Sequence, residues 1–274
     1  MGLSLPPAVS HGSGHVPRSA GVEVNGHQAA GQPGGRALAL MILLALVPVP
    51  ALAQAVDHGG HTVHDRSINF QVLFDQLEWQ FVHGEPGSRW DSRSWIGGDI
   101  HKVWIRTEGD AVDGGLDAAE AQLLYGRSIS RWWDLLAGVR FDARPSPAHT
   151  WLALGVQGLA PQFLDVQATM YVGSGGHVAA RLEVEHDMHI TRKLVLQPLV
   201  ELSLSGADDP DREIARGLST AEVGFRFRYE FKKELAPYAG IVWHKKLFGT
   251  GDFARERNSD PGGWHLVAGL RFWL

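Results

Sequence analysis

A period-two alternation of apolar and charged residues constrains this chain more than any other feature. In HVAARLEVEHDMH (residues 177–189), the even positions from 178 to 184 are apolar and the odd positions from 181 to 187 are charged. The stretches LSTAEVGFRFRYEF (218–231) and GGWHLVAGLRFWL (262–274) repeat the alternation, each with one aromatic-rich apolar parity. This pattern predicts strands with one face against an apolar medium and the other against water.

A soluble β-sandwich also alternates, but three further features favour a membrane barrel. The polar parities are densely charged over several strands, and the chain stops on an alternating, aromatic-rich strand. Aromatic residues recur near the predicted strand ends, where the interfacial girdle of a barrel would lie. They are Trp132, Trp133, Trp151, Tyr171, Tyr229, Trp243, Trp264 and Trp273. We therefore predict an all-β fold, an antiparallel transmembrane β-barrel in the bacterial outer membrane with lipid around it.

The number of strands follows from the alternation of short and long connections, because bacterial barrels have short periplasmic turns and longer outer loops. Short turns are predicted at 128–130, 160–162, 191–193 and 232–234, and outer connections at 108–115, 144–148, 173–176, 206–217 and 249–263. A hairpin turn at Gly97-Gly98 separates strands at 89–96 and 99–107. This pattern predicts twelve strands, an even number as such barrels require, with ten as the alternative.

The N-terminal part divides into a leader and a short tail. Arg36, the apolar run 37–47 and the small residues Ala51 and Ala53 have the order of a secretory signal peptide. Residues 1–35 lack periodicity, so no fold is expected there, and the long lead suggests a start codon assigned too far upstream. The predicted organisation is a disordered lead and signal peptide (1–53), a flexible periplasmic tail (54–66) and a barrel (67–274).

Composition excludes several classes of site. The chain has no cysteine, which removes disulfides, thiolate metal sites and thiol nucleophiles. Its net charge is −5, and residues 1–53 contribute +1 through Arg18, Arg36 and Glu23, so the remainder carries −6. A mildly acidic chain without a basic patch argues against nucleic acid as a partner.

Long stretches of the predicted barrel resemble the copper resistance protein B family of bacterial outer-membrane proteins. The resemblance runs from about Phe74 to Leu274 through FDQLEWQF, WIGGDIHKVWIRTEGD, AEAQLLYGRSISRWWDLLAGVRFD, TWLALGVQGLAPQFLDVQATMYVG, ARLEVEHDMHITRKLVLQPLVEL and AEVGFRFRYEFKKELAPYAGIVWHKKLFG. It implies a non-catalytic barrel that binds copper ions, or lets them pass, and lowers periplasmic copper beside periplasmic copper-handling proteins. Members commonly carry an N-terminal extension rich in Met and His, whereas the chain after residue 53 keeps only Met170 and Met188.

The tail VDHGGHTVHD (56–65) is the first candidate copper site. His58, His61 and His64 offer imidazoles and Asp57 a carboxylate, while glycines let the backbone fold around an ion. Imidazole suits Cu(II), and capture should weaken as pH falls through the histidine range near 6.5. The alternative is a solvated linker that binds nothing.

The second candidate lies in EVEHDMH (183–189). Glu185, Asp187 and His189 share the predicted lumen parity near the periplasmic mouth, whereas His186 and Met188 share the opposite one. The alternative is an ordinary charged lumen in which these carboxylates pair with Arg181 or Arg226.

Other polar residues are placed in the lumen by parity alone. They are the histidines His101, His244 and His265 and the carboxylates Glu78, Glu120 and Glu222. Parity gives the face of a strand but no height along the barrel, so these residues do not define a site.

Two other functions compete with copper handling. A general diffusion pore is one, although twelve strands enclose a lumen that side chains can largely fill. A lipid-acting hydrolase is the other, and it needs a serine and a histidine on the lipid-facing side. Ser219 has the outward parity, but no partner histidine can be named.

Overall fold

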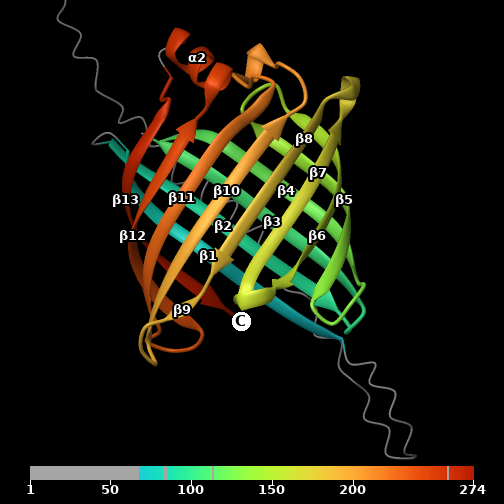
Figure 1. Ribbon diagram of the computed structural model, residues 1–274, viewed down its shortest axis with the longest axis vertical. Helices are drawn as coiled ribbons and strands as arrows, with labels where there is room; N and C mark the ends of the chain where they lie inside the picture. Colours follow the sequence, from blue (N-terminus) through green and yellow to red (C-terminus); the bar gives the residue numbers. More distant parts are fainter. Residues whose placement is uncertain (1–67, 83–84, 113, 258) are drawn as a thin grey trace, which may run out of the picture. The chain divides into compact units, whose positions relative to one another are not determined.

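The computed structural model describes residues 68–82, 85–112, 114–257 and 259–274 (Figure 1). The predicted leader (1–53) and tail (54–66) lie outside these residues. The strands are Asn69–Val82 (β1), Glu85–Gly97 (β2), His101–Val112 (β3), Gly115–Ser128 (β4), Trp133–Arg144 (β5), His149–Ala160 (β6), Leu164–Gly173 (β7), Val178–His186 (β8), Met188–His189 (β9), Leu194–Ser205 (β10), Gly217–Tyr229 (β11), Leu235–Lys246 (β12) and Gly262–Trp273 (β13).

The strands close into an antiparallel barrel. Within β1 to β8 and within β10 to β13 each strand pairs with the next in sequence, β8 and β9 both pair with β10, and β1 pairs with β13 to complete the ring. Strand β9 continues β8 along β10 after a break at Asp187, so the two count as one, and the barrel has 12 strands. The predicted fold class and the preferred strand number are confirmed.

The two faces of the sheet differ as the alternation predicts. On β4, Leu123 and Tyr125 are exposed on the outside, while Gln122 and Leu124 are buried inside. Leu152 on β6 is 65% exposed on the same outer surface. A sheet that turns large apolar side chains outward all around is stable in hydrocarbon rather than in water. None of the helices in the described part of the chain combines the length and apolar composition of a membrane-spanning helix.

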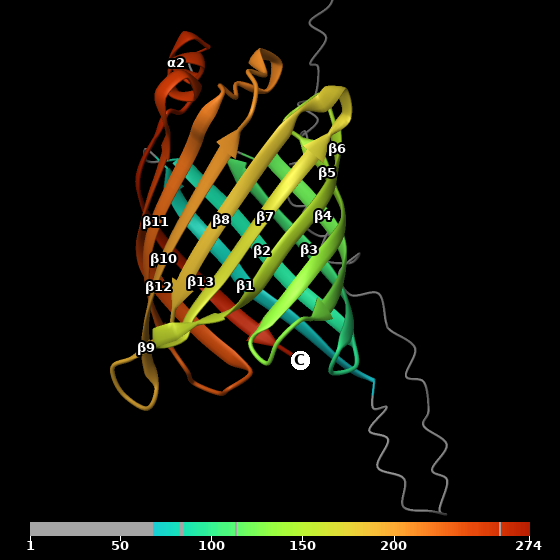
Figure 2. The ribbon, with the colours of Figure 1, turned by 45° about the vertical axis from the view of Figure 1, so that its right-hand side comes forward.

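The connections fall at two ends of the barrel. One end, the terminal mouth, carries the C-terminus, the start of β1 and the short turns after β2, β4, β6, β9 and β11 (Figure 2). The other end, the loop mouth, carries the long connections and the helix Phe248–Glu256 (α2). The two long connections, 206–216 and 247–261, lie at the loop mouth as the sequence predicts, but the connections after β3, β5 and β7 are as short as the turns at the terminal mouth.

Two details differ from the sequence expectation. Residues 108–115 do not form a loop, because β3 runs to Val112 and β4 starts at Gly115. The lumen parity of β3 therefore continues through Glu108 and Asp110, which pair with Glu120 and Ala118 across the sheet. Within the predicted loop 249–263, Thr250 and Ala254 are buried, and this packing supports α2.

Candidate functional site

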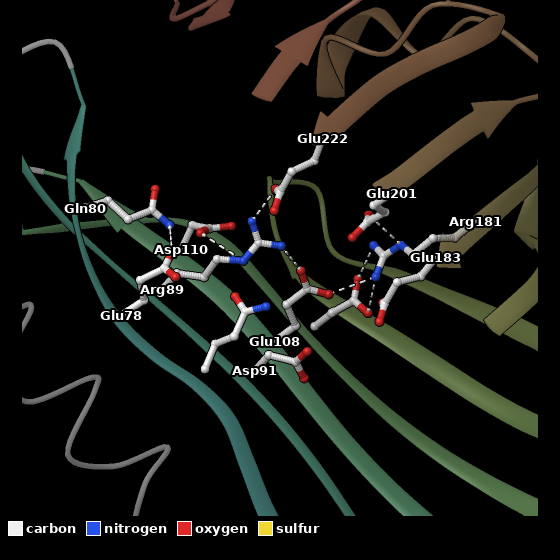
Figure 3. A network of polar contacts seen from close by, with 12 residues as sticks. Glu78, Gln80, Arg89, Asp91, Glu108, Asp110, Arg181, Glu183, Glu201 and Glu222 are labelled. Carbon is white, nitrogen blue, oxygen red and sulfur yellow. Dashed lines mark hydrogen bonds and ion pairs between the residues drawn. The ribbon is translucent and has the colours of Figure 1, made fainter. Parts of the chain in front are cut away.

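A network of ion pairs crosses the lumen, nearer to the loop mouth than to the terminal mouth. Arg89 on β2 is shared by carboxylates from two sides: its Nη1 lies 2.7 Å from Glu222 Oε2 on β11, and its Nη2 lies 2.7 Å from Glu108 Oε1 on β3 (Figure 3). Its Nε is 3.9 Å from Asp110. One guanidinium thus connects strands that lie four positions apart in the sheet.

Arg181 on β8 is the second centre of this network. Its Nη1 lies 2.8 Å from Glu108 Oε2, its Nη2 lies 3.0 Å from Glu120 Oε2, and its Nε lies 3.3 Å from Glu201 Oε1. Glu108 accepts from both arginines, so the two centres are joined (Figure 3). We call these residues the lumen belt: Arg89, Glu108, Glu120, Arg181, Glu201 and Glu222.

A second layer lies between the lumen belt and the terminal mouth. Arg93 contacts Asp75 at 2.6 Å, Glu183 at 3.4 Å and Glu185 at 3.7 Å. Asp75 also contacts Arg271 at 2.7 Å. In both layers each arginine faces more than one carboxylate, which satisfies charges that a narrow lumen shields from bulk water.

The lumen belt separates two spaces of unequal size. A cavity of about 710 Å³ extends from the belt to the loop mouth, where Arg212 and Thr250 line it. A space of only about 40 Å³ lies on the other side, beside Asp91 and Arg93. Glu108, Glu120 and Arg181 line both spaces, so the belt is the wall between them.

The tail residues of the first predicted copper site, His58, His61, His64 and Asp57, lie outside the described residues. Within the described ranges, no group of three or more His, Asp or Glu side chains is arranged to hold a metal ion.

The residues of the second predicted copper site, Glu185, Asp187 and His189, do not converge on one point but have separate surroundings. Glu185 is buried in the lumen, where Gln197 donates to it at 3.2 Å and Arg93 lies 3.7 Å away. Asp187 is paired with Arg228 at 2.6 Å, and His189 is exposed beside the terminal mouth. The carboxylates are indeed paired with arginine, but the partners are not the predicted Arg181 and Arg226.

The parity assignments are largely confirmed. Glu78 and Glu222 are buried in the lumen, and Glu120 belongs to the lumen belt. His244 and His265 line the large cavity. His101 was assigned wrongly: it shares the outer face with Val103 and Ile105, and its Nδ1 is 2.5 Å from the hydroxyl of Tyr125.

Ser219 is also placed differently from the prediction. Ser203 and Leu204 of β10 pair with Thr220 and Leu218, so Ser219 is the extra residue of a bulge on β11, and this changes its parity. Its hydroxyl is buried and donates to the carbonyl of Ser203 at 2.9 Å. Ser219 therefore lacks the lipid-facing position that the hydrolase alternative needs.

Sequence reasoning missed the arginines of β2, which occupy the centres of both layers. The segment RWDSRS (89–94) places Arg89, Asp91 and Arg93 on one parity. The charged parity is visible in the sequence. The other parity holds Trp90 and two serines, so it does not have the apolar character of a lipid-facing side. Trp90 is buried rather than lipid-facing and packs over Gly109, where an added Cβ would lie 2.1 Å from the indole ring.

Comparison with known proteins extends over the whole barrel. A family model described as "Copper resistance protein B precursor (CopB)" matches residues 68–274. A copper resistance protein B homolog of Pseudomonas syringae pv. tomato is 42% identical over 233 residues, which cover 83% of this chain and 79% of that protein. Copper resistance protein B of Escherichia coli is 44% identical over 215 residues, covering 78% and 73%. Among solved structures, the NanC porin matches 74% of this chain and 99% of its own with a TM-score of 0.50 at 10% identity, a likeness of fold alone.

Proposed function

The chain belongs to the copper resistance protein B family, and from this premise we propose that it lowers periplasmic copper by binding copper ions at the outer membrane. The observation that carries the proposal is the family match along the entire barrel, together with two relatives above 40% identity named for copper resistance. A family of this kind on a porin-like barrel supports a role without catalysis.

We propose that copper is captured by the tail rather than by the barrel. In the lumen, Glu108, Glu185 and Asp187 are each engaged by arginine, so copper would have to displace a guanidinium to reach them. The tail offers His58, His61 and His64 with Asp57, a set of nitrogen and oxygen donors that suits Cu(II).

The position of β1 supports a periplasmic tail. The tail immediately precedes β1, whose first residues lie at the terminal mouth with the C-terminus. Bacterial barrels have their short turns on the periplasmic side and their longer loops outside. We therefore propose that the terminal mouth faces the periplasm, where the tail can receive copper and exchange it with periplasmic copper-handling proteins.

The lumen belt bears on the alternative of a general pore. Because Arg89 and Arg181 join carboxylates from four other strands, the belt spans six strands and interrupts the lumen below the large cavity. We propose that the barrel is closed at rest. Planar-bilayer recordings test this: steady open-channel currents from the unmodified protein, unaffected by copper, would support a plain pore instead.

Copper binding by the refolded protein tests the site of capture. Equilibrium dialysis against Cu(II) should show copper bound to the protein that begins at residue 54 and little bound after deletion of residues 54–66. A variant with His58, His61 and His64 changed to Ala should behave like the deletion. The substitution Glu185→Gln, a matched change in the barrel, should leave binding intact. Full retention of copper after the deletion would place the site in the barrel and make Glu185, Asp187 and His189 the leading candidates.

A further inference from the structure

Six basic side chains at the terminal mouth are exposed and have no carboxylate partner among the described residues. We call them the basic arc: Arg127, Arg131, Arg192, Lys193, Lys232 and Lys233. They contrast with Arg89 and Arg181 of the lumen, each of which contacts three carboxylates. The basic arc therefore carries positive charges that no ion pair within the described residues engages, although Glu230 and Glu234 lie in the same turn as Lys232 and Lys233.

The position of Arg127 indicates that the basic arc lies at the level of the lipid headgroups. Arg127 is exposed on the outer face of β4, on the same parity as Leu123 and Tyr125. Its neighbour across the ladder is His101, whose imidazole bonds to Tyr125. An arginine on the lipid-facing side, close to a strand end, reaches the headgroup region with its guanidinium.

Aromatic rings on the outer face hold two other members of the basic arc. The guanidinium of Arg131 lies 5.2 Å from the ring of Trp132, and the ammonium of Lys193 lies 6.0 Å from the ring of Tyr229. Both rings are about half exposed. Cations stacked on aromatic side chains at this height are at the boundary between hydrocarbon and water.

The turns that carry the basic arc also expose apolar tips. Ile129 precedes Arg131, Ile190 precedes Arg192, and Phe231 precedes Lys232. These three side chains are 57%, 54% and 65% exposed, although each lies at a tight turn where a polar residue would be usual in water. Phe163, in the intervening turn, is 76% exposed. An apolar tip beside a base fits an interface in which hydrocarbon and anionic groups meet.

From these observations we propose that the basic arc binds anionic phospholipid headgroups, such as phosphatidylglycerol, in the leaflet around the terminal mouth. The apolar tips insert at the hydrocarbon boundary, and the bases contact the lipid phosphates above them. The arrangement of the turns favours lipid over an acidic protein. The bases lie at the turns after β4, β9 and β11, which are separated from one another along the closed sheet (Figure 2). Separate lipids can contact each turn, whereas a protein needs one continuous patch.

Spin-labelled lipids test this proposal on the refolded protein that begins at residue 54. In phosphatidylcholine bilayers, labelled phosphatidylglycerol should associate with the barrel surface several times more strongly than labelled phosphatidylcholine. The double substitution Lys232→Gln/Lys233→Gln should lower that preference, by up to about fivefold for each base that contacts a lipid. Arg127→Gln/Arg192→Gln should do the same. In 1 M salt the preference of the unmodified protein should largely disappear, because the Debye length falls to about 3 Å.

The matched control is Arg216→Gln/Arg257→Gln, which removes the same charge from two exposed arginines at the loop mouth. This variant should keep the preference for phosphatidylglycerol. An equal loss of the phosphatidylglycerol preference in the control and in the two basic-arc variants would overturn the proposal, since net charge alone would then explain the effect. So would an unmodified protein that shows no preference, or one whose preference survives 1 M salt. The salt measurement needs no variant, so the proposal is tested even if the substitutions impair refolding.

Discussion

Most arginines in the lumen are buried or half-buried and paired with carboxylates, whereas the residues of the basic arc at the terminal mouth, on strands of the same barrel or in the turns between them, are exposed. Arg226, in the lumen, is 2% exposed and donates to Glu78 and Gln76. Lys232 and Lys233, in the turn three and four residues after the end of β11, are exposed and meet no carboxylate in the described structure. The lumen confines its charges away from bulk water, so each needs a partner within the protein. At the terminal mouth, water and lipid headgroups can solvate the basic arc. Folding of the barrel therefore does not depend on protein partners for these charges.

The largest effect should follow from removing a buried lumen charge. Arg226→Ala leaves Glu78, which is fully buried, without its guanidinium partner at 2.9 Å. Breaking such a pair costs about 3–5 kcal/mol in the free energy of unfolding. The measurement is urea-induced unfolding from phospholipid bilayers, followed by tryptophan fluorescence.

A surface pair of similar geometry provides the control for Arg226. Arg255 lies 2.6 Å from Asp252 on α2, but both side chains are about two-thirds exposed. Arg255→Ala should change the free energy of unfolding by no more than about 1 kcal/mol. Equal costs for Arg226→Ala and Arg255→Ala would show that the lumen is well hydrated and that confinement does not distinguish the two regions.

The second prediction concerns an arginine placed on the outer face at a different height. Leu123 shares its parity with Arg127 but lies four residues further toward the loop mouth, and it is 53% exposed. Leu123→Arg should cost about 2–4 kcal/mol in the same unfolding measurement, because the charge would lie within the hydrocarbon. If the variant were as stable as the unmodified protein, the position of the membrane boundary inferred from Arg127 would be wrong.

The strands and connections could be predicted from the sequence because each strand repeats its own alternation. The outer face at Phe225, Phe227 and Tyr229, for example, follows directly from LSTAEVGFRFRYEF. Partners across the lumen could not be predicted in this way, because parity gives no height and no information on strands far apart in the sequence. The ion-pair partner of Glu185 is therefore Arg93, which lies 92 positions earlier, while its own hairpin supplies only the amide of Gln197.

Local irregularities account for the remaining errors. The bulge at Ser219, opposite Ser203 and Leu204, reverses the expected parity of this serine, and nothing in the sequence of β11 marks it. Glu108 and Asp110 were expected in a loop because the stretch EGDAVDGG has a turn-like composition. Arg89 on the neighbouring strand β2 contacts both carboxylates and favours the extended strand there. Arg181 on β8 contacts Glu108 across the lumen, and this second contact exists only once the barrel has closed.

The third prediction concerns Arg212, which reaches into the lumen from the connection 206–216 at the loop mouth. Its Nη2 lies 2.9 Å from Asp142 Oδ2 on β5, and Asp142 also accepts from Arg140 and from the indole of Trp151. Since two donors remain, Arg212→Ala should cost less than Arg226→Ala, about 1–3 kcal/mol. Hydrogen exchange in 206–216 should accelerate, while exchange in the terminal turns stays unchanged. Unchanged exchange in 206–216 would mean that Arg212 does not hold this connection in place.

The smallest effect is expected at the rim. Lys232→Gln/Lys233→Gln removes two charges that have no partner in the described protein, so the free energy of unfolding in phosphatidylcholine should change by no more than about 0.5 kcal/mol. In bilayers that contain phosphatidylglycerol the unmodified protein should gain stability relative to this variant, because the lipid stabilises only the folded barrel. A large loss of stability in phosphatidylcholine alone would show that these lysines support the fold itself. The basic arc would then resemble the lumen arginines in depending on contacts within the protein, and lipid would not be its partner.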